Sequence, residues 1–114
     1  MLLNAGANAN KQDRFGTTPL MFAVRKNQLQ IARTLIKYGA RVETNDFTGT
    51  TPLLIAVKDN NYALAQYLLE NGARATTTDR SNQAPIDYAL KNNNLALANL
   101  LLAHGAKRPN ILGR

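Results

Sequence analysis

The sequence predicts an all-α solenoid of stacked helix-turn-helix units joined by hairpin-like loops. Two observations lead to this fold class. The first is a 33-residue period, in which Thr18-Pro19-Leu20 recurs as Thr51-Pro52-Leu53 and again as Ala84-Pro85-Ile86. The second is a Gly-Ala pair near the end of each unit, at residues 39–40, 72–73 and 105–106. A fixed period of this length is typical of repeats that stack and share one core.

Each unit carries the signals of a first helix. Thr18 and Thr51 suit an N-cap because a hydroxyl oxygen can accept a free backbone N–H. The proline that follows suits the first helical position, which needs no N–H. We expect these helices over about residues 19–26, 52–59 and 85–92, each followed by an asparagine that tolerates the left-handed conformation. The third unit lacks the threonine, so its first turn is expected to be the loosest, with Asp87 compensating in part as an anion.

The second helix of each unit has a broad apolar face. In the middle unit the stripe at i, i+2, i+3, i+6 and i+7 consists of Tyr62, Leu64, Ala65, Leu68 and Leu69. A glycine then stops the helix, and the polar residues 41–48 indicate an extended loop with a turn at its tip. Asp13, Asp46 and Asp79 recur at the unit spacing and are expected to organise these turns through side-chain hydrogen bonds.

These motifs resemble the ankyrin repeat, whose pattern includes Asp-x-x-Gly-x-Thr-Pro-Leu-His and a terminal Gly-Ala. The resemblance covers about residues 1–107 and implies a partial repeat at 1–10, full repeats at 11–43, 44–76 and 77–107, and a tail at 108–114. The family's His is replaced by Met21, Leu54 and Asp87, so we expect the loops between units to be held less firmly. We also expect the chain to be cut from a longer array that ends near Leu112, where the next Asp would fall.

The composition excludes most kinds of active site. The 114 residues include no Cys, and the single histidine, His104, cannot build a zinc site alone. Ser81 is the only serine, no nucleophile–base constellation can be assembled, and no glycine-rich phosphate loop or calcium loop is present. The sequence therefore predicts a protein that is not an enzyme and holds no metal or cofactor. The lack of cysteine and of a signal peptide favours the cytoplasm, with a secreted effector left open.

Basic residues dominate the charge. Fourteen Lys and Arg against seven Asp and Glu give a net charge of +7, which favours a partner with an acidic surface. Eight of these residues fall into columns at the repeat spacing: Arg25, Lys58 and Lys91; Arg41, Arg74 and Lys107; and Arg14 and Arg80 on either side of Phe47. The alternative is a merely solvated surface, because charged side chains are mostly exposed in any protein.

The resemblance also implies where a partner would bind. Ankyrin ligands usually lie in a groove formed by loop tips and first helices. The matching positions here are Arg14, Phe15, Thr17, Arg25, Lys26, Phe47, Thr48, Thr50, Lys58, Asp59, Arg80, Ser81, Gln83, Lys91 and Asn92. Phe15 and Phe47 fit two interpretations equally: anchors for a partner, or packing of one loop tip against the next.

Three classes of function remain from the sequence. The first is a protein-interaction scaffold that recognises an acidic segment. The second is binding to nucleic acid or to an anionic membrane surface. The sequence argues against it, because it has few aromatic residues on which bases could stack and no evident recognition helix. The third is a scaffold portion of a larger effector or enzyme. An apolar outer face on the last helix, at Ala96, Leu100 and Ala103, is either covered by the tail or available for self-association.

Overall fold

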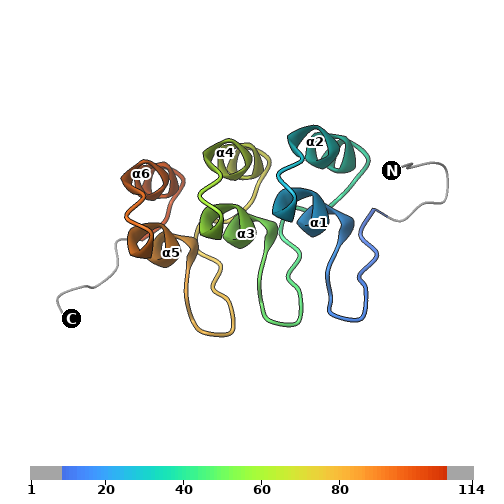
Figure 1. The fold of residues 1–114 in the computed structure, drawn as a ribbon, viewed down its shortest axis with the longest axis horizontal. Coiled ribbons are helices and arrows are strands. Elements are labelled where there is room, and N and C mark those ends of the chain that lie inside the picture. The colour runs from blue at the N-terminus through green and yellow to red at the C-terminus, as the bar shows by residue number, and fades with distance from the viewer. Residues whose placement is uncertain (1–8, 108–114) are drawn as a thin grey trace.

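The computed structural model describes residues 9–107, which form three pairs of helices. The helices are α1 (Pro19–Arg25), α2 (Leu29–Lys37), α3 (Pro52–Lys58), α4 (Tyr62–Glu70), α5 (Pro85–Lys91) and α6 (Leu95–Ala103). In Figure 1, α1, α3 and α5 form one row and α2, α4 and α6 a second row, with the connecting loops projecting from the first row. No strand occurs between residues 9 and 107, so the prediction of an all-α repeat stack is confirmed.

The first helices begin as their capping residues predict. The hydroxyl oxygens of Thr18 and Thr51 accept hydrogen bonds from the N–H groups of residues 21 and 54, each at 3.2 Å. Ala84 offers no such acceptor in the third unit. Instead, the Asp87 carboxylate accepts the N–H of Ala84 at 2.8 Å, which is the second half of a capping box. Asp87 therefore stabilises the turn that lacks a threonine.

These helices end one residue earlier than the sequence predicts. Lys26, Asp59 and Asn92 serve as C-caps rather than as the last helical residues. The next residue is an asparagine in each unit, with φ of 56° at Asn27, and this left-handed conformation was predicted correctly. An L residue with positive φ cannot continue a right-handed helix, so the chain turns there into the second helix.

Two of these left-handed asparagines, Asn27 and Asn60, also link neighbouring units. The side chain of Asn61 donates to Asn27 Oδ1 at 2.6 Å, and that of Asn94 donates to Asn60 Oδ1 at 3.1 Å. The donor of each pair lies in the unit after the acceptor. Hydrogen bonds of this kind fix the register in which one helix pair stacks on the next.

The core runs along the stack as a continuous spine. Leu20, Leu53 and Ile86 occupy one position in the three units and are all buried. Helix α3 packs against α1, α4 and α5, and α6 packs against α5 and α4. Burying a leucine contributes about 2 kcal/mol. Each unit therefore depends on its neighbours for much of its stability.

The apolar stripe of the second helices differs in two ways from the prediction. Tyr62 and Leu95 are 42% and 67% exposed, because the first residue of each of these helices lies at the edge of the stripe. Leu100 belongs to the buried core, although the sequence placed it on the outer face. Helix α6 has no charged residue that would define a narrow polar side, so its buried face is wider than the stripe predicts. The expected cover from the tail at 108–114 lies outside the described residues.

The loop tips are organised by the repeated aspartates, as predicted. Asp13 Oδ1 accepts the N–H groups of Phe15 and Thr17, both at 2.9 Å, and Asp46 and Asp79 do the same two and four residues further on. Adjacent tips are joined by a backbone bond from the Phe47 N–H to the Phe15 carbonyl, 3.0 Å long. A matching bond runs from residue 80 to the carbonyl of residue 48. Neighbouring loops are therefore tied together without the family's histidine.

The approach of these loops gives a testable prediction about stability. A Cβ at Gly49 would lie 2.9 Å from Arg80 N, whereas one at Gly39 would have nothing within 4 Å. Both glycines have positive φ, +80° and +99°, so alanine is strained at either position. We expect Gly49→Ala to lower the free energy of unfolding in urea by about 1–3 kcal/mol more than Gly39→Ala does. Equal losses would mean that the loops do not approach so closely in solution.

Candidate functional site

An open hollow of about 440 Å³ lies between the first and second units. Its lining comes from the end of α1, from α3 and its C-cap, and from the second loop. The residues are Arg25, Asp46, Thr48, Thr50, Ile55, Lys58 and Asp59. Five of the fifteen residues that the sequence proposed for partner binding thus meet in one place: Arg25, Thr48, Thr50, Lys58 and Asp59.

The charges around the hollow are of both signs. Burial acts to raise the pKa of Asp46, but hydrogen bonds from the Thr48 hydroxyl and from two backbone N–H groups, together with the Arg25 charge, hold that pKa below its ordinary value. The Thr48 hydroxyl donates to Asp46 Oδ1 at 2.6 Å. Asp46 is therefore ionised and stabilises the turn of its loop. The side chains of Arg25, Lys58 and Asp59 line the same hollow.

The corresponding position between the second and third units has different chemistry. Tyr88 stands there in place of Ile55. The Lys58 Nζ lies 4.7 Å from the centre of the Tyr88 ring, and the Tyr88 hydroxyl donates to Asp79 Oδ2. That hydrogen bond, burial and the negative charge of Asp79 raise the pKa of Tyr88 to about 12. The Tyr88 ring thus links α5 to the loop of its own unit. At the equivalent position of the preceding unit, the smaller Ile55 leaves a hollow.

Sequence reasoning missed this column of Phe22, Ile55 and Tyr88. Its members lie three residues before Arg25, Lys58 and Lys91, which puts them on the same helix face as the basic column. That spacing was the available signal. The three side chains differ in size, and a hollow is found beside Ile55.

Thirteen of the fifteen proposed residues are exposed, and two are not. Thr17 and Thr50 are each only 7% exposed, although the sequence placed them on the surface. Their N–H groups donate to Asp13 and Asp46 within the loop turn. Gln83 makes the same bond to Asp79 and stays exposed, so the turn alone does not account for the burial. The exposed residues are Arg14, Phe15, Lys26, Arg25, Phe47, Thr48, Lys58, Asp59, Arg80, Ser81, Gln83, Lys91 and Asn92.

The two phenylalanines at the tips show the loop packing that was one of the two sequence interpretations, and the other, a role as partner anchors, stays a prediction. Phe47 packs against the preceding loop, since a Cβ on Gly16 would lie 2.8 Å from Phe47 Cδ1. Phe15 and Phe47 nevertheless remain 64% and 60% exposed. The Arg14 guanidinium carbon lies 5.8 Å from the centre of the Phe15 ring, within range of a cation–π contact. Each ring is held by its neighbours and still offers an open face.

A model of three ankyrin repeats matches residues 1–79 and 43–111. The chain belongs to the ankyrin-repeat family. No curated protein sequence matches it. Ankyrin repeats are generally protein–protein interaction modules and are typically not catalytic.

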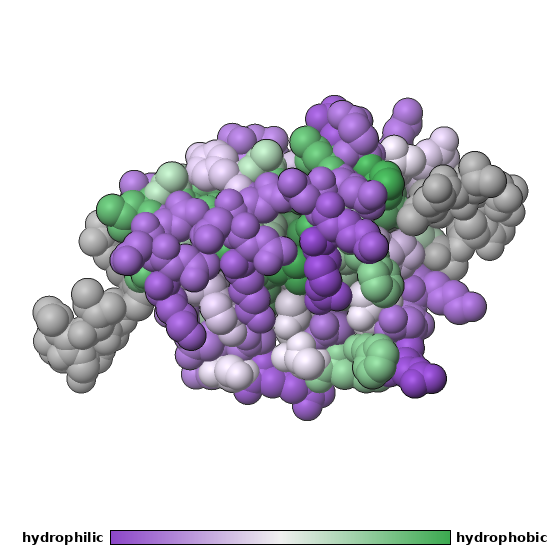
Figure 2. All heavy atoms as spheres, viewed as in Figure 1, coloured by the Kyte–Doolittle hydropathy of each residue, from purple (hydrophilic) through white to green (hydrophobic). Residues whose placement is uncertain are grey.

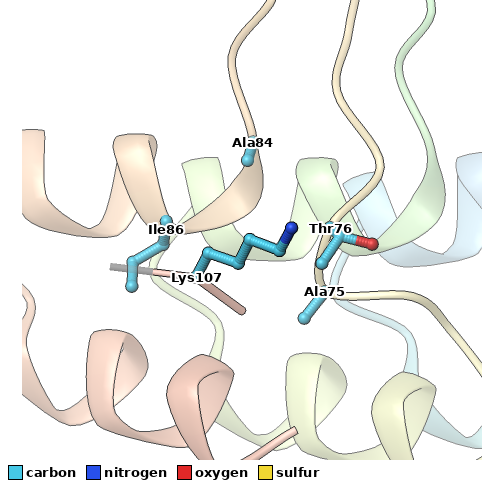
Figure 3. A pocket seen from close by; sticks show the side chains of 5 residues that line it. All are labelled: Ala75, Thr76, Ala84, Ile86 and Lys107. Carbon is cyan, nitrogen blue, oxygen red and sulfur yellow. The ribbon is translucent and has the colours of Figure 1, made fainter. Parts of the chain in front are cut away.

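A second pocket lies at the C-terminal end of the ankyrin stack. It has a volume of about 240 Å³ and is lined by Ala75, Thr76, Ala84, Ile86 and Lys107. Figure 3 shows the extended Lys107 side chain lying between Ile86 and Thr76. Its lining comes from the second and third units, and none of these five residues is among the proposed binding positions.

The ankyrin groove presents cations, hydroxyls and aromatic rings. Within residues 9–107 no group of three or more potential metal ligands is found. In the same part of the chain no helix has the length and apolar character to cross a membrane. Ser81 lies at a loop tip, and His104 is the C-cap of α6.

The Tyr88–Asp79 hydrogen bond can be tested by titration. A folded-state pKa of about 12, above the ordinary 10.0, means that this bond contributes stability below pH 10 and loses it as the pH rises to 12. We expect ultraviolet absorbance to show a phenolate step near pH 12 that is missing in Tyr88→Phe. Asp79→Asn is expected to move this step to a lower pH. Asp46→Asn changes the same loop position in the preceding unit and is expected to leave the pH of the step unchanged. An unchanged step in Asp79→Asn would contradict the bond.

Proposed function

We propose that this ankyrin protein captures an acidic segment of a partner protein along the groove face, defined by its loop tips and the exposed ends of α1, α3 and α5. One observation carries the proposal. Arg25, Lys58 and Lys91 each stand in the last turn of their helix and are exposed. Repetition at 33 residues places them in one column beside the loops.

This basic column would affect both the rate at which an acidic partner associates with the groove and the strength of its binding. Two of its members, Arg25 and Lys58, line the hollow between the first two units, where a carboxylate would meet both cations. Positive charge on a binding face raises the rate of association with an acidic partner and discriminates against a basic one. The exposed Phe15 and Phe47 add apolar contact area at the edge of the same face.

The proposal is tested with Arg25→Glu, Lys58→Glu and Lys91→Glu combined. We expect the far-ultraviolet circular dichroism of this variant to match that of the wild type, because the three side chains are exposed and each helix end loses at most about 1 kcal/mol. Capture of partner proteins from a cell lysate is expected to be lost.

The matched control combines Arg41→Glu, Arg74→Glu and Lys107→Glu. These residues form the other full basic column, so the control has the same net charge and the same spacing. It is expected to retain capture. Retained capture by the first variant would place the interface elsewhere, and equal loss in both would indicate attraction through net charge alone.

Nucleic acid or an anionic membrane is the competing ligand class for a chain of net charge +7. Phosphate neutralisation makes affinity fall steeply with salt concentration. A groove with aromatic contacts keeps more of its affinity, so a salt titration of the captured complex separates the two classes.

A further inference from the structure

The charge of the chain is unevenly distributed along the stack. The first unit, residues 11–43, has seven basic and two acidic residues, a net charge of +5. The second unit, residues 44–76, has two basic and three acidic residues, a net charge of −1. The third, residues 77–107, has three basic and two acidic residues, a net charge of +1. Both acids of the first unit, Asp13 and Glu43, accept hydrogen bonds from backbone N–H groups.

The exposed phenylalanine rings lie toward the same end, in the first unit and the loop that follows it. The chain has three phenylalanines, and all of them are exposed: Phe15 at 64%, Phe22 at 45% and Phe47 at 60%. A small domain ordinarily buries residues of this type. Figure 2 shows apolar atoms at the loop ends on the N-terminal side of the molecule, among hydrophilic ones.

These rings share one part of the groove face. Phe47 contacts the tip that carries Phe15, and the two residues share a backbone hydrogen bond of 3.0 Å. Phe15 and Phe22 occupy the repeat positions that Thr48 and Ile55 occupy one unit later. Thr48 and Ile55 line the same hollow. By this equivalence Phe22 lies on the side of α1 that faces the first loop, with Arg25 one helical turn further on.

We propose that the binding strength of the groove is concentrated on this N-terminal aromatic–basic patch: Phe15, Phe22 and Phe47 with Arg14, Arg25 and Lys26. Its ligand is a short protein segment that alternates acidic and apolar side chains. The carboxylates pair with the three cations, and the apolar side chains pack on the exposed rings. This inference rests on the proposed function and adds the place and the polarity of binding to it.

The charge pattern favours such a segment over a nucleic acid strand. A strand carries one phosphate per nucleotide and needs a basic track that follows its backbone. Here the basic track is interrupted, because the second unit has a net charge of −1 and presents Asp59 in the groove. A short acidic cluster needs only one basic unit, which the first repeat provides.

The test uses the whole chain and two fluorescein-labelled peptides in anisotropy titrations. One peptide repeats Glu-Leu-Glu-Ser, and the other has the same number of Glu residues with Ser in place of Leu. We expect the first peptide to bind more tightly. Arg14→Gln with Arg25→Gln is expected to weaken it at least about tenfold, equivalent to about 1.4 kcal/mol. Arg80→Gln with Lys91→Gln changes the same two repeat positions in the third unit and is expected to cost less than about threefold.

The aromatic rings are tested separately. Phe15→Ser with Phe22→Ser is expected to remove the advantage of the leucine-containing peptide. The control, Tyr38→Ser with Tyr62→Ser, changes two other exposed aromatic side chains and is expected to keep that advantage. Circular dichroism of all four variants shows that each remains folded.

The outcomes separate this inference from the proposed function. Equal losses in the two charge variants would overturn the concentration on the first unit and leave capture along the whole groove in place. Failure of both peptides to bind would overturn the proposed function as well. Tighter binding of an oligothymidylate strand than of either peptide would overturn both in favour of nucleic acid.

Discussion

The structure depends on the burial of apolar side chains between neighbouring units. One unit of 33 residues is too small to enclose a core of its own. Leu53 is fully buried because α3 packs against both α1 and α5. The asparagine side chains and the backbone bonds between loop tips then fix the register of the stack. The loop tips and the exposed ends of the first helices lie outside this spine and remain free for contact with another molecule.

Stacking turns a sequence period into columns of side chains on one face of the molecule. Residues 33 apart become neighbours, so one repeated position becomes one column of the groove face. Differences within a column then give the groove local character. Ile55 leaves a hollow between Arg25 and Lys58, whereas Tyr88 at the same position of the next unit bonds to Asp79 and stacks under Lys58. The net charge also differs from unit to unit along the stack, so its two ends differ in chemistry.

Local signals in the sequence were sufficient for the helices and turns. Threonine caps, left-handed asparagines and turn aspartates act within a few residues, so their roles follow from spacing alone. Features that arise between units were not predicted. Thr17 and Thr50 are buried whereas Gln83, at the same position of the third unit, is exposed. The hollow between the first two units needs the relative placement of α1, α3 and a loop. Leu100 joins the core because α6 lacks a charged side. Of the candidate site, the basic column was found from the period, but the adjoining column of Phe22, Ile55 and Tyr88 was missed.

The dependence of each unit on its neighbours is tested most directly by far-ultraviolet circular dichroism of the middle unit alone. A peptide of residues 44–76 contains α3 and α4 with their caps but none of the adjoining helices. The spectrum is expected to be that of an unfolded chain without a cooperative thermal transition, whereas residues 9–107 give a helical spectrum and a single transition. A helical, cooperatively melting 44–76 peptide would contradict the shared spine as the source of stability.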